Sequence, residues 1–153
     1  AAGGRVMVRT SPDLASGTTT FLTFFGSAAY DANPTAFNST VFINTPITVD
    51  STGTMFFGFE VTGSNPAGLT SGIARVTSAG VGTWVSAVAA SGDALIAKPV
   101  MQAAPALSPD GATLYVPVNT AVSSGVQTGY LLALNSTTLA TNSPTARLLA
   151  GLR

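Results

Sequence analysis

Apolar and polar positions alternate along much of the chain, a pattern that predicts β-strands. Apolar residues alternate with arginines over residues 5–9, and residues 20–25 are rich in Phe and Thr. A period of two gives a strand one buried and one polar face. The other segments of strand character are residues 47–49, 54–61, 72–76, 82–88, 104–107, 113–118, 129–134 and 145–149. We therefore expect an all-β fold of antiparallel sheets.

The most regular of these segments is residues 54–61. In a strand, its odd-numbered residues from Phe57 to Val61 would share one face, and its even-numbered residues from Phe56 to Glu60 the other. Helical periodicity is not sustained anywhere in the chain. Only residues 146–153 could form a short helix instead of a strand, since Ala, Arg and Leu have high helix propensity.

A unit made of a proline, a short strand, an Asp/Gly turn and a second strand occurs twice, over residues 45–57 and 104–116. The turn glycines Gly53 and Gly111 are 58 positions apart. Asp and Gly at these places are typical of tight turns. A period of this length indicates one four-stranded sheet per repeat, as in a propeller or a repeat array. Residues 4–25 would supply half of such a sheet, residues 41–90 a whole one and residues 100–149 another.

These repeats resemble the blades of known propellers. The resemblance to a quinoprotein-type (PQQ-like) blade rests on residues 45–58, 72–76 and 83–84 and, in the second copy, on residues 105–111, 114–116 and 129–134. Ser108-Pro-Asp-Gly111 is also similar to the strand-opening turn of TolB-like propellers. The resemblance implies antiparallel four-stranded blades, and it implies little about activity. The second repeat lacks a counterpart of Trp84.

The strand count predicts about two and a half blades, whereas closed propellers typically have about 4–8. We therefore expect an incomplete propeller or one completed by oligomerisation. The partners would be other copies of the chain or the rest of a larger propeller, with a glycan as a further candidate.

Residues 26–40 are expected to form a long connection without regular structure. Loops of this length are often functional, so Tyr30, Asp31, Asn33 and Phe37 are the candidate residues for binding a ligand or partner. Asp31 and Asn33 are also the nearest approach to a calcium site, although a capped turn explains this pair more simply. For the single tryptophan, Trp84, packing in the core is favoured over stacking on a ligand.

Charge and chemistry exclude several function classes. Charged residues make up 8% of the chain and the net charge is zero, so a nucleic-acid surface with its many phosphate contacts is not expected. The most apolar stretch, residues 85–107, is interrupted by Asp93, Lys98 and Pro99, which argues against a membrane span. With no His and no Cys, the chain cannot form a Ser–His–Asp or Cys–His site.

Carboxylates are therefore the remaining candidate acid–base groups. Asp50 and Glu60 could form an acid–base pair, but a turn-capping aspartate and a solvated glutamate are the favoured interpretation. We expect no catalytic residue, no cofactor and no metal.

The absence of Cys and the abundance of Ser and Thr favour a secreted or cell-surface bacterial protein. No charged-then-apolar leader opens the sequence, so any signal peptide would lie outside it. Asn38 and Asn135 match the glycosylation sequon. The expected function is an extracytoplasmic repeat protein for binding or assembly. The alternatives are a segment of a larger quinoprotein-like enzyme and a carbohydrate-binding module.

Overall fold

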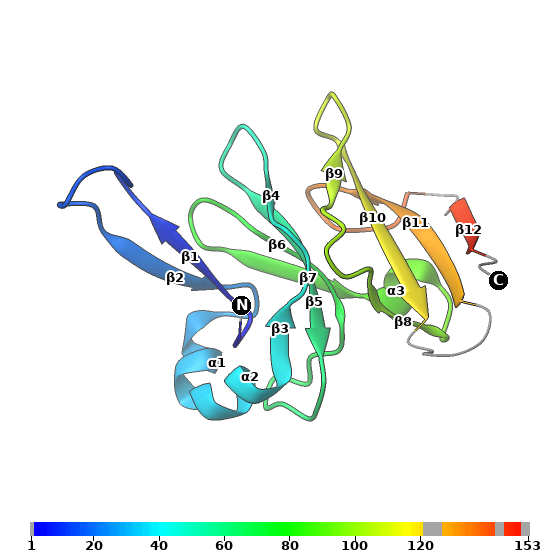
Figure 1. Ribbon diagram of the computed structural model, residues 1–153, viewed down its shortest axis with the longest axis horizontal. Helices are drawn as coiled ribbons and strands as arrows, with labels where there is room; N and C mark the ends of the chain where they lie inside the picture. Colours follow the sequence, from blue (N-terminus) through cyan, green and yellow to red (C-terminus); the bar gives the residue numbers. More distant parts are fainter. Residues whose placement is uncertain (1, 121–126, 143–145, 151–153) are drawn as a thin grey trace.

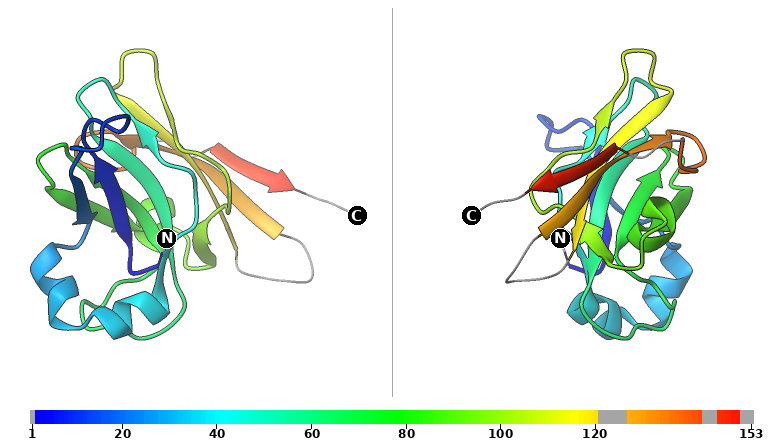
Figure 2. Two further views of the ribbon diagram at one scale, coloured as in Figure 1. Left: turned by 60° about the vertical axis from the view of Figure 1, so that its left-hand side comes forward. Right: turned by 90° about the vertical axis from the view of Figure 1, so that its right-hand side faces the viewer.

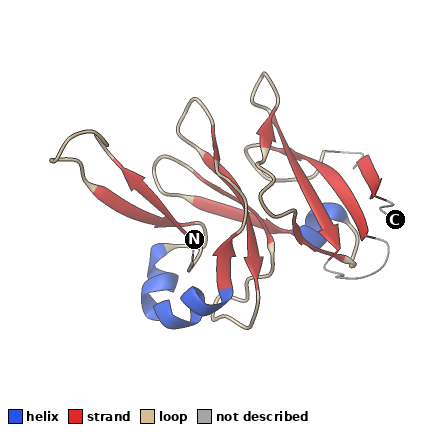
Figure 3. Ribbon diagram, in the orientation of Figure 1, coloured by secondary structure: helices blue, strands red, loops and turns tan. Residues whose placement is uncertain are grey.

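The computed structural model describes residues 2–120, 127–142 and 146–150. Strands account for 41% of the chain and helices for 14%, so the fold is mostly β (Figure 3). The strands form antiparallel sheets, and within the described ranges none of these sheets closes into a barrel. The expectation of an antiparallel β fold is confirmed at this level.

The chain begins with a hairpin of β1 (Arg5–Arg9) and β2 (Thr19–Thr23). Both strands lie where the sequence predicts them. Met7 pairs with Phe21 in the ladder, and the Thr10 amide donates to the Thr18 carbonyl at the start of the turn. We call this two-stranded sheet the N-terminal hairpin.

The connection that follows is helical, so the prediction of an unstructured loop over residues 26–40 is wrong. It contains α1 (Ser27–Ala32) and α2 (Pro34–Thr40). Asn33 caps α2 through its side-chain oxygen, which accepts from the Ala36 amide, and Pro34 occupies the first turn. Each helix has two turns or fewer, too few for a helical period to stand out in the sequence.

The central sheet contains β3 (Val41–Ile43), β4 (Thr48–Val49), β5 (Met55–Val61), β6 (Gly72–Val76) and β7 (Gly82–Ser86). Its strand order is β3-β5-β6-β7, and β4 also pairs with β5, so β3 and β4 form one interrupted edge strand. The predicted strand over residues 82–88 ends at Ser86. The Ser86 side chain caps α3 (Ala87–Ser91) by accepting from the Ala89 amide.

The C-terminal sheet has the same plan. Its strands are β8 (Ile96–Pro99), β9 (Ala106–Leu107), β10 (Thr113–Thr120), β11 (Gln127–Asn135) and β12 (Ala146–Ala150). Their order is β12-β11-β10-β8, with β9 also beside β10. The sheet therefore begins at Ile96 and not at residue 100, and its last segment is a strand as far as Ala150.

A proline inside a strand indicates either an edge or a bulge. Pro117 lies in the middle of β10, which has neighbours on both sides and so is not an edge strand, but its register with β8 shifts between Asn119 and Thr120. Its position is tolerated because it faces the break between β8 and β9, where the Val100 amide donates to the Pro117 carbonyl. Gly58 occupies the same place opposite the break between β3 and β4, where its carbonyl accepts from the Asn44 amide.

The three sheets lie side by side in chain order, each packed against the next (Figure 1). One core joins the hairpin and both N-terminal helices to the central sheet; its largest fully buried side chains are Phe24, Phe37, Phe57 and Phe59. A second core joins the opposite face of the central sheet to the C-terminal sheet and α3. Figure 2 shows the turns before β2, β5 and β10 at one end and α1 and α2 at the other.

Candidate functional site

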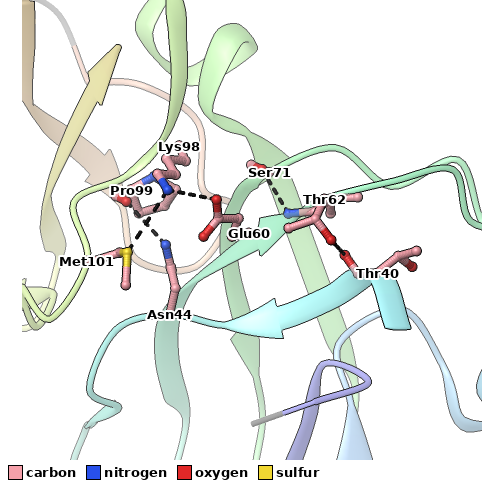
Figure 4. Close-up of polar contacts among 9 residues, drawn as sticks. Thr40, Asn44, Glu60, Thr62, Ser71, Lys98, Pro99 and Met101 are labelled. Atoms are coloured by element: carbon pink, nitrogen blue, oxygen red, sulfur yellow. Dashed lines mark hydrogen bonds and ion pairs between the residues drawn. The ribbon is translucent and has the colours of Figure 1, made fainter. Parts of the chain in front are cut away.

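Polar side chains from the two larger sheets meet around Glu60 and Lys98 (Figure 4). Glu60 is on β5 and Lys98 on β8. The Lys98 Nζ lies 2.7 Å from the Glu60 Oε1, and the side chains of Lys98 and Glu60 are 24% and 26% exposed, respectively. Alternation along β5 puts Phe57 and Phe59 in the core with the N-terminal hairpin and Phe56 on the opposite face. Glu60 shares the face of Phe56, so it points towards the C-terminal sheet, which contains Lys98.

Asn44 extends this cluster across the junction of the sheets. Its side-chain amide donates to the Pro99 carbonyl at 3.3 Å, and its main-chain carbonyl accepts from the Gln102 amide at 3.1 Å. The Asn44 Oδ1 is buried and accepts no hydrogen bond from the part of the chain that the structure describes. Asn44 thus ties the break between β3 and β4 to β8, and it retains one unused acceptor.

Gly58 makes the close approach of β8 sterically feasible. A Cβ atom at this position would lie 2.6 Å from the Pro99 Cβ and 2.7 Å from the Thr45 Cγ2, closer than carbon atoms can pack. The Gly58 amide also donates to the Thr45 hydroxyl at 2.8 Å. Nearby, Ser71 accepts from the Val61 amide, which fixes the end of β5 beyond Glu60 (Figure 4).

The chemistry available to this cluster is limited. Its carboxylate and ammonium neutralise each other, and neither has a His or Cys neighbour, since the chain contains none. Within the described ranges, no three or more metal-binding side chains of the His, Cys, Asp and Glu types lie together. The arrangement is suited to holding two sheets in register and to hydrogen bonding with a polar ligand.

Asp50 and Asp110 have turn-forming roles, as the sequence predicts. Donation from the Thr52 hydroxyl, and from the Thr54 and Thr52 amides, holds the pKa of Asp50 below its usual 3.8, although burial opposes the shift. The Ser108 hydroxyl and the Ala112 amide likewise lower the pKa of Asp110. The counterpart of Asp50 in the second repeat is nevertheless Ser108 and not Asp110. The Asp50 side chain accepts from the Thr54 amide, and the Ser108 side chain accepts from the Thr113 amide in the same way. In both turns the main-chain amide of the first residue donates back to the carbonyl of the last.

Asp50 and Glu60 do not share a site. Asp50 precedes β5, and Glu60 is the sixth residue of that strand. The five residue steps along β5 from Met55 to Glu60 span roughly 17 Å, at about 3.3 Å for each residue. The acid–base pair that we considered from the sequence is therefore excluded.

The four candidate binding residues between β2 and β3 have different surroundings. Tyr30 is 7% exposed and Phe37 is fully buried, with the Phe37 ring stacked at 4.6 Å on Phe25. Asp31 and Asn33 are exposed, and Asn33 caps α2. The two aromatic rings are thus core side chains in this structure, while the two polar residues remain accessible.

Two hollows border the N-terminal hairpin, where it meets the central sheet. A groove of about 440 Å³ lies towards β4, and its lining is Met7, Val8, Arg9, Leu22, Val49, Gly53, Met55 and Ser78. A hollow of about 460 Å³ lies towards β7, lined by Phe24, Phe25, Gly26, Ala67, Leu69, Gly80, Val81, Gly82 and Trp84. Trp84 is half-buried and meets Phe59 edge to face at 5.9 Å, in accord with its expected packing role.

Sequence reasoning did not single out Lys98 or Asn44. One signal was present: Lys98 is the only lysine of the chain and Glu60 its only glutamate. Their partnership depends on which sheet faces stack, and no local pattern encodes that.

Comparison of the chain with protein-family models, curated proteins and solved structures finds no match. None of the helices in the described ranges has the length and apolar character needed to cross a membrane.

Proposed function

We propose that this chain is an extracytoplasmic β-propeller-type repeat protein with a role in binding or assembly and no catalysis of its own. The observation that carries the proposal is the repeated plan of the two larger sheets, each with an interrupted first strand followed by three antiparallel strands. The last strand of one sheet leads to the first strand of the next through helices, α1 and α2 in one case and α3 in the other. Consecutive propeller blades are sheets of this kind.

The surface supports a role in association. Large apolar side chains are exposed at several places, among them Met7 at 64%, Val81 at 63% and Leu95 at 74%. With no net charge, the chain also lacks the self-repulsion that keeps copies or partners apart. The low charge and the absence of Cys support an extracytoplasmic setting.

Three of the described carboxylates have structural partners, which supports a non-catalytic role. Asp50 and Asp110 are engaged in turns, and Glu60 is neutralised by Lys98.

The test is an activity screen of the purified chain against chromogenic esters, glycosides and phosphates and in a dye-linked alcohol oxidation, with Glu60→Gln as the paired variant. We expect both proteins to give the background rate. Turnover by the wild-type chain would overturn the proposal, and its loss in Glu60→Gln would identify the carboxylate responsible.

A further inference from the structure

The hairpin-facing side of the central sheet is only partly covered. The hairpin, α1 and α2 all pack on this side, but among the described residues the part of the sheet at β4 stays exposed. Val49 pairs with Met55 of the core on this side and is 57% exposed, and Ile47, just before β4, is 40% exposed. On the opposite side of the same edge, the Thr48 hydroxyl donates to the Pro105 carbonyl, and the neighbouring Phe56 is only 1% exposed.

The uncovered region lies beside the free edge of β1. The other strand of the hairpin, β2, lies over β7, because Gly82 packs directly against the backbone of Phe24. Among the described residues, β1 pairs with β2 alone. Met7, Val8 and Arg9 of β1 line one groove together with Val49 of β4, so the second edge of β1 borders that groove. Just before β1, Ala2 bridges to Phe42 of β3.

The backbone of this edge can form further strand pairs. Residues of an antiparallel pair alternate between bonding towards the partner strand and away from it. Thr10 donates its amide to Thr18, so Val8 also bonds towards β2. Met7 and Arg9 then direct their amides and carbonyls away from β2, towards the uncovered side.

The groove of about 440 Å³ separates this edge from the central sheet. Three of its lining residues, Val8, Leu22 and Met55, belong to the core between the hairpin and the central sheet, so the groove continues an interface that already exists. Arg9 lines the groove but does not make it an anion site, because its guanidinium donates hydrogen bonds to Gly17, Leu14 and Thr19.

We propose that the free edge of β1 and this groove accept an extended β-strand from another polypeptide. The strand pairs with the amides and carbonyls of Met7 and Arg9, and alternate apolar side chains enter the groove against Val49 and Met55. Strand addition of this kind takes its affinity from main-chain hydrogen bonds and its specificity from pockets for every second side chain. The proposal deepens the binding role proposed above and rests on it.

The chain itself supplies a suitable probe. In β10, the alternate residues Leu114, Val116 and Val118 are almost fully buried in the core that the C-terminal sheet shares with the central sheet. A fluorescently labelled peptide with the sequence of residues 111–120 therefore presents alternate apolar side chains, which in the folded chain pack against the other face of the central sheet. A control peptide carries Thr in place of Leu114, Val116 and Val118.

The experiment measures binding of the labelled peptide to the full chain by fluorescence anisotropy. We expect saturable binding that Val49→Asp weakens about tenfold or more, since it places a charge in the apolar groove. Val81→Asp is the matched control: Val81 is 63% exposed but lies outside this groove, and the variant should bind like wild type. The control peptide should bind much more weakly, because it keeps the main-chain hydrogen bonds but lacks the apolar side chains that enter the groove.

Amide hydrogen exchange by NMR locates the contact without a mutation. Bound peptide should slow exchange at the Met7 and Arg9 amides. Absence of binding by wild-type chain, equal weakening by Val49→Asp and Val81→Asp, or unchanged exchange at both amides would overturn the proposal. A wild-type dimer that Val49→Asp dissociates would also overturn it, by assigning the groove to a second copy. These outcomes are separate from enzymatic turnover, which tests the proposed function.

Discussion

Glu60 and Lys98, the only glutamate and the only lysine of the chain, form an ion pair with each other across two sheets. They are 38 positions apart in sequence. Their meeting depends on two neighbours: Gly58 lacks the side chain that would keep β8 away, and Pro99 fills the space that Gly58 leaves. This ion pair therefore joins the central sheet to the C-terminal sheet, in a chain that has few charged residues.

A double-mutant cycle should detect the coupling between these two side chains. We expect Glu60→Gln and Lys98→Met to show a coupling free energy of about 1 kcal/mol, at the upper end for partly exposed pairs, because only about a quarter of each side chain is exposed. The measurement is urea unfolding of the wild type, both single variants and the double variant. High salt should reduce the coupling. Strict additivity of the two single effects would contradict a stabilising pair.

Gly58→Ala should destabilise the protein by about 1–3 kcal/mol, because the added methyl group overpacks the contact with Pro99 and Thr45. Urea unfolding measures the loss. Gly63→Ala is the matched control, since its nearest neighbour is a single Thr40 methyl group at 3.2 Å. Equal effects of the two substitutions would argue against close contact between β5 and β8.

Phe37→Ala tests whether α1 and α2 belong to the core. Because the ring is fully buried and stacked on Phe25, we expect a loss of about 3–5 kcal/mol in the free energy of unfolding. Asp31→Ala, at an exposed position between the same strands, should change it by less than about 0.5 kcal/mol. A small effect of Phe37→Ala would mean that the ring is available for a ligand, as the sequence suggested.

Asp50 should make stability depend on pH in the acid range. Its folded-state pKa lies below its usual 3.8, so the native state binds the proton more weakly than the unfolded chain does. The resulting stabilisation is present above that usual value and is lost as the pH falls through the folded pKa. Urea midpoints between about pH 6 and pH 2 should therefore converge for wild type and Asp50→Asn as the solution becomes more acidic. A constant difference would show that the charge of Asp50 makes no contribution.

Local patterns predicted most strands and turns. Alternation along β1 and β5 placed their faces correctly, and the repeated Asp/Gly turns marked the same point in both larger sheets. The helices α1 and α2 were missed because each is short and the break at Asn33 interrupts any period between Tyr30 and Phe37. Strand β8 was missed because it contains only four residues, Ile96–Pro99, with Lys98 among them.

The sequence by itself determined the β character, the repeat and the two faces of β5, since alternation and turn chemistry act between neighbouring residues. Only the tertiary structure decided that Glu60 meets Lys98, that Tyr30 and Phe37 are buried, and that Pro117 is accommodated in an inner strand. Each of these depends on which sheet faces and strand edges come together. Such contacts are made between segments far apart in the chain, so no local pattern carries them.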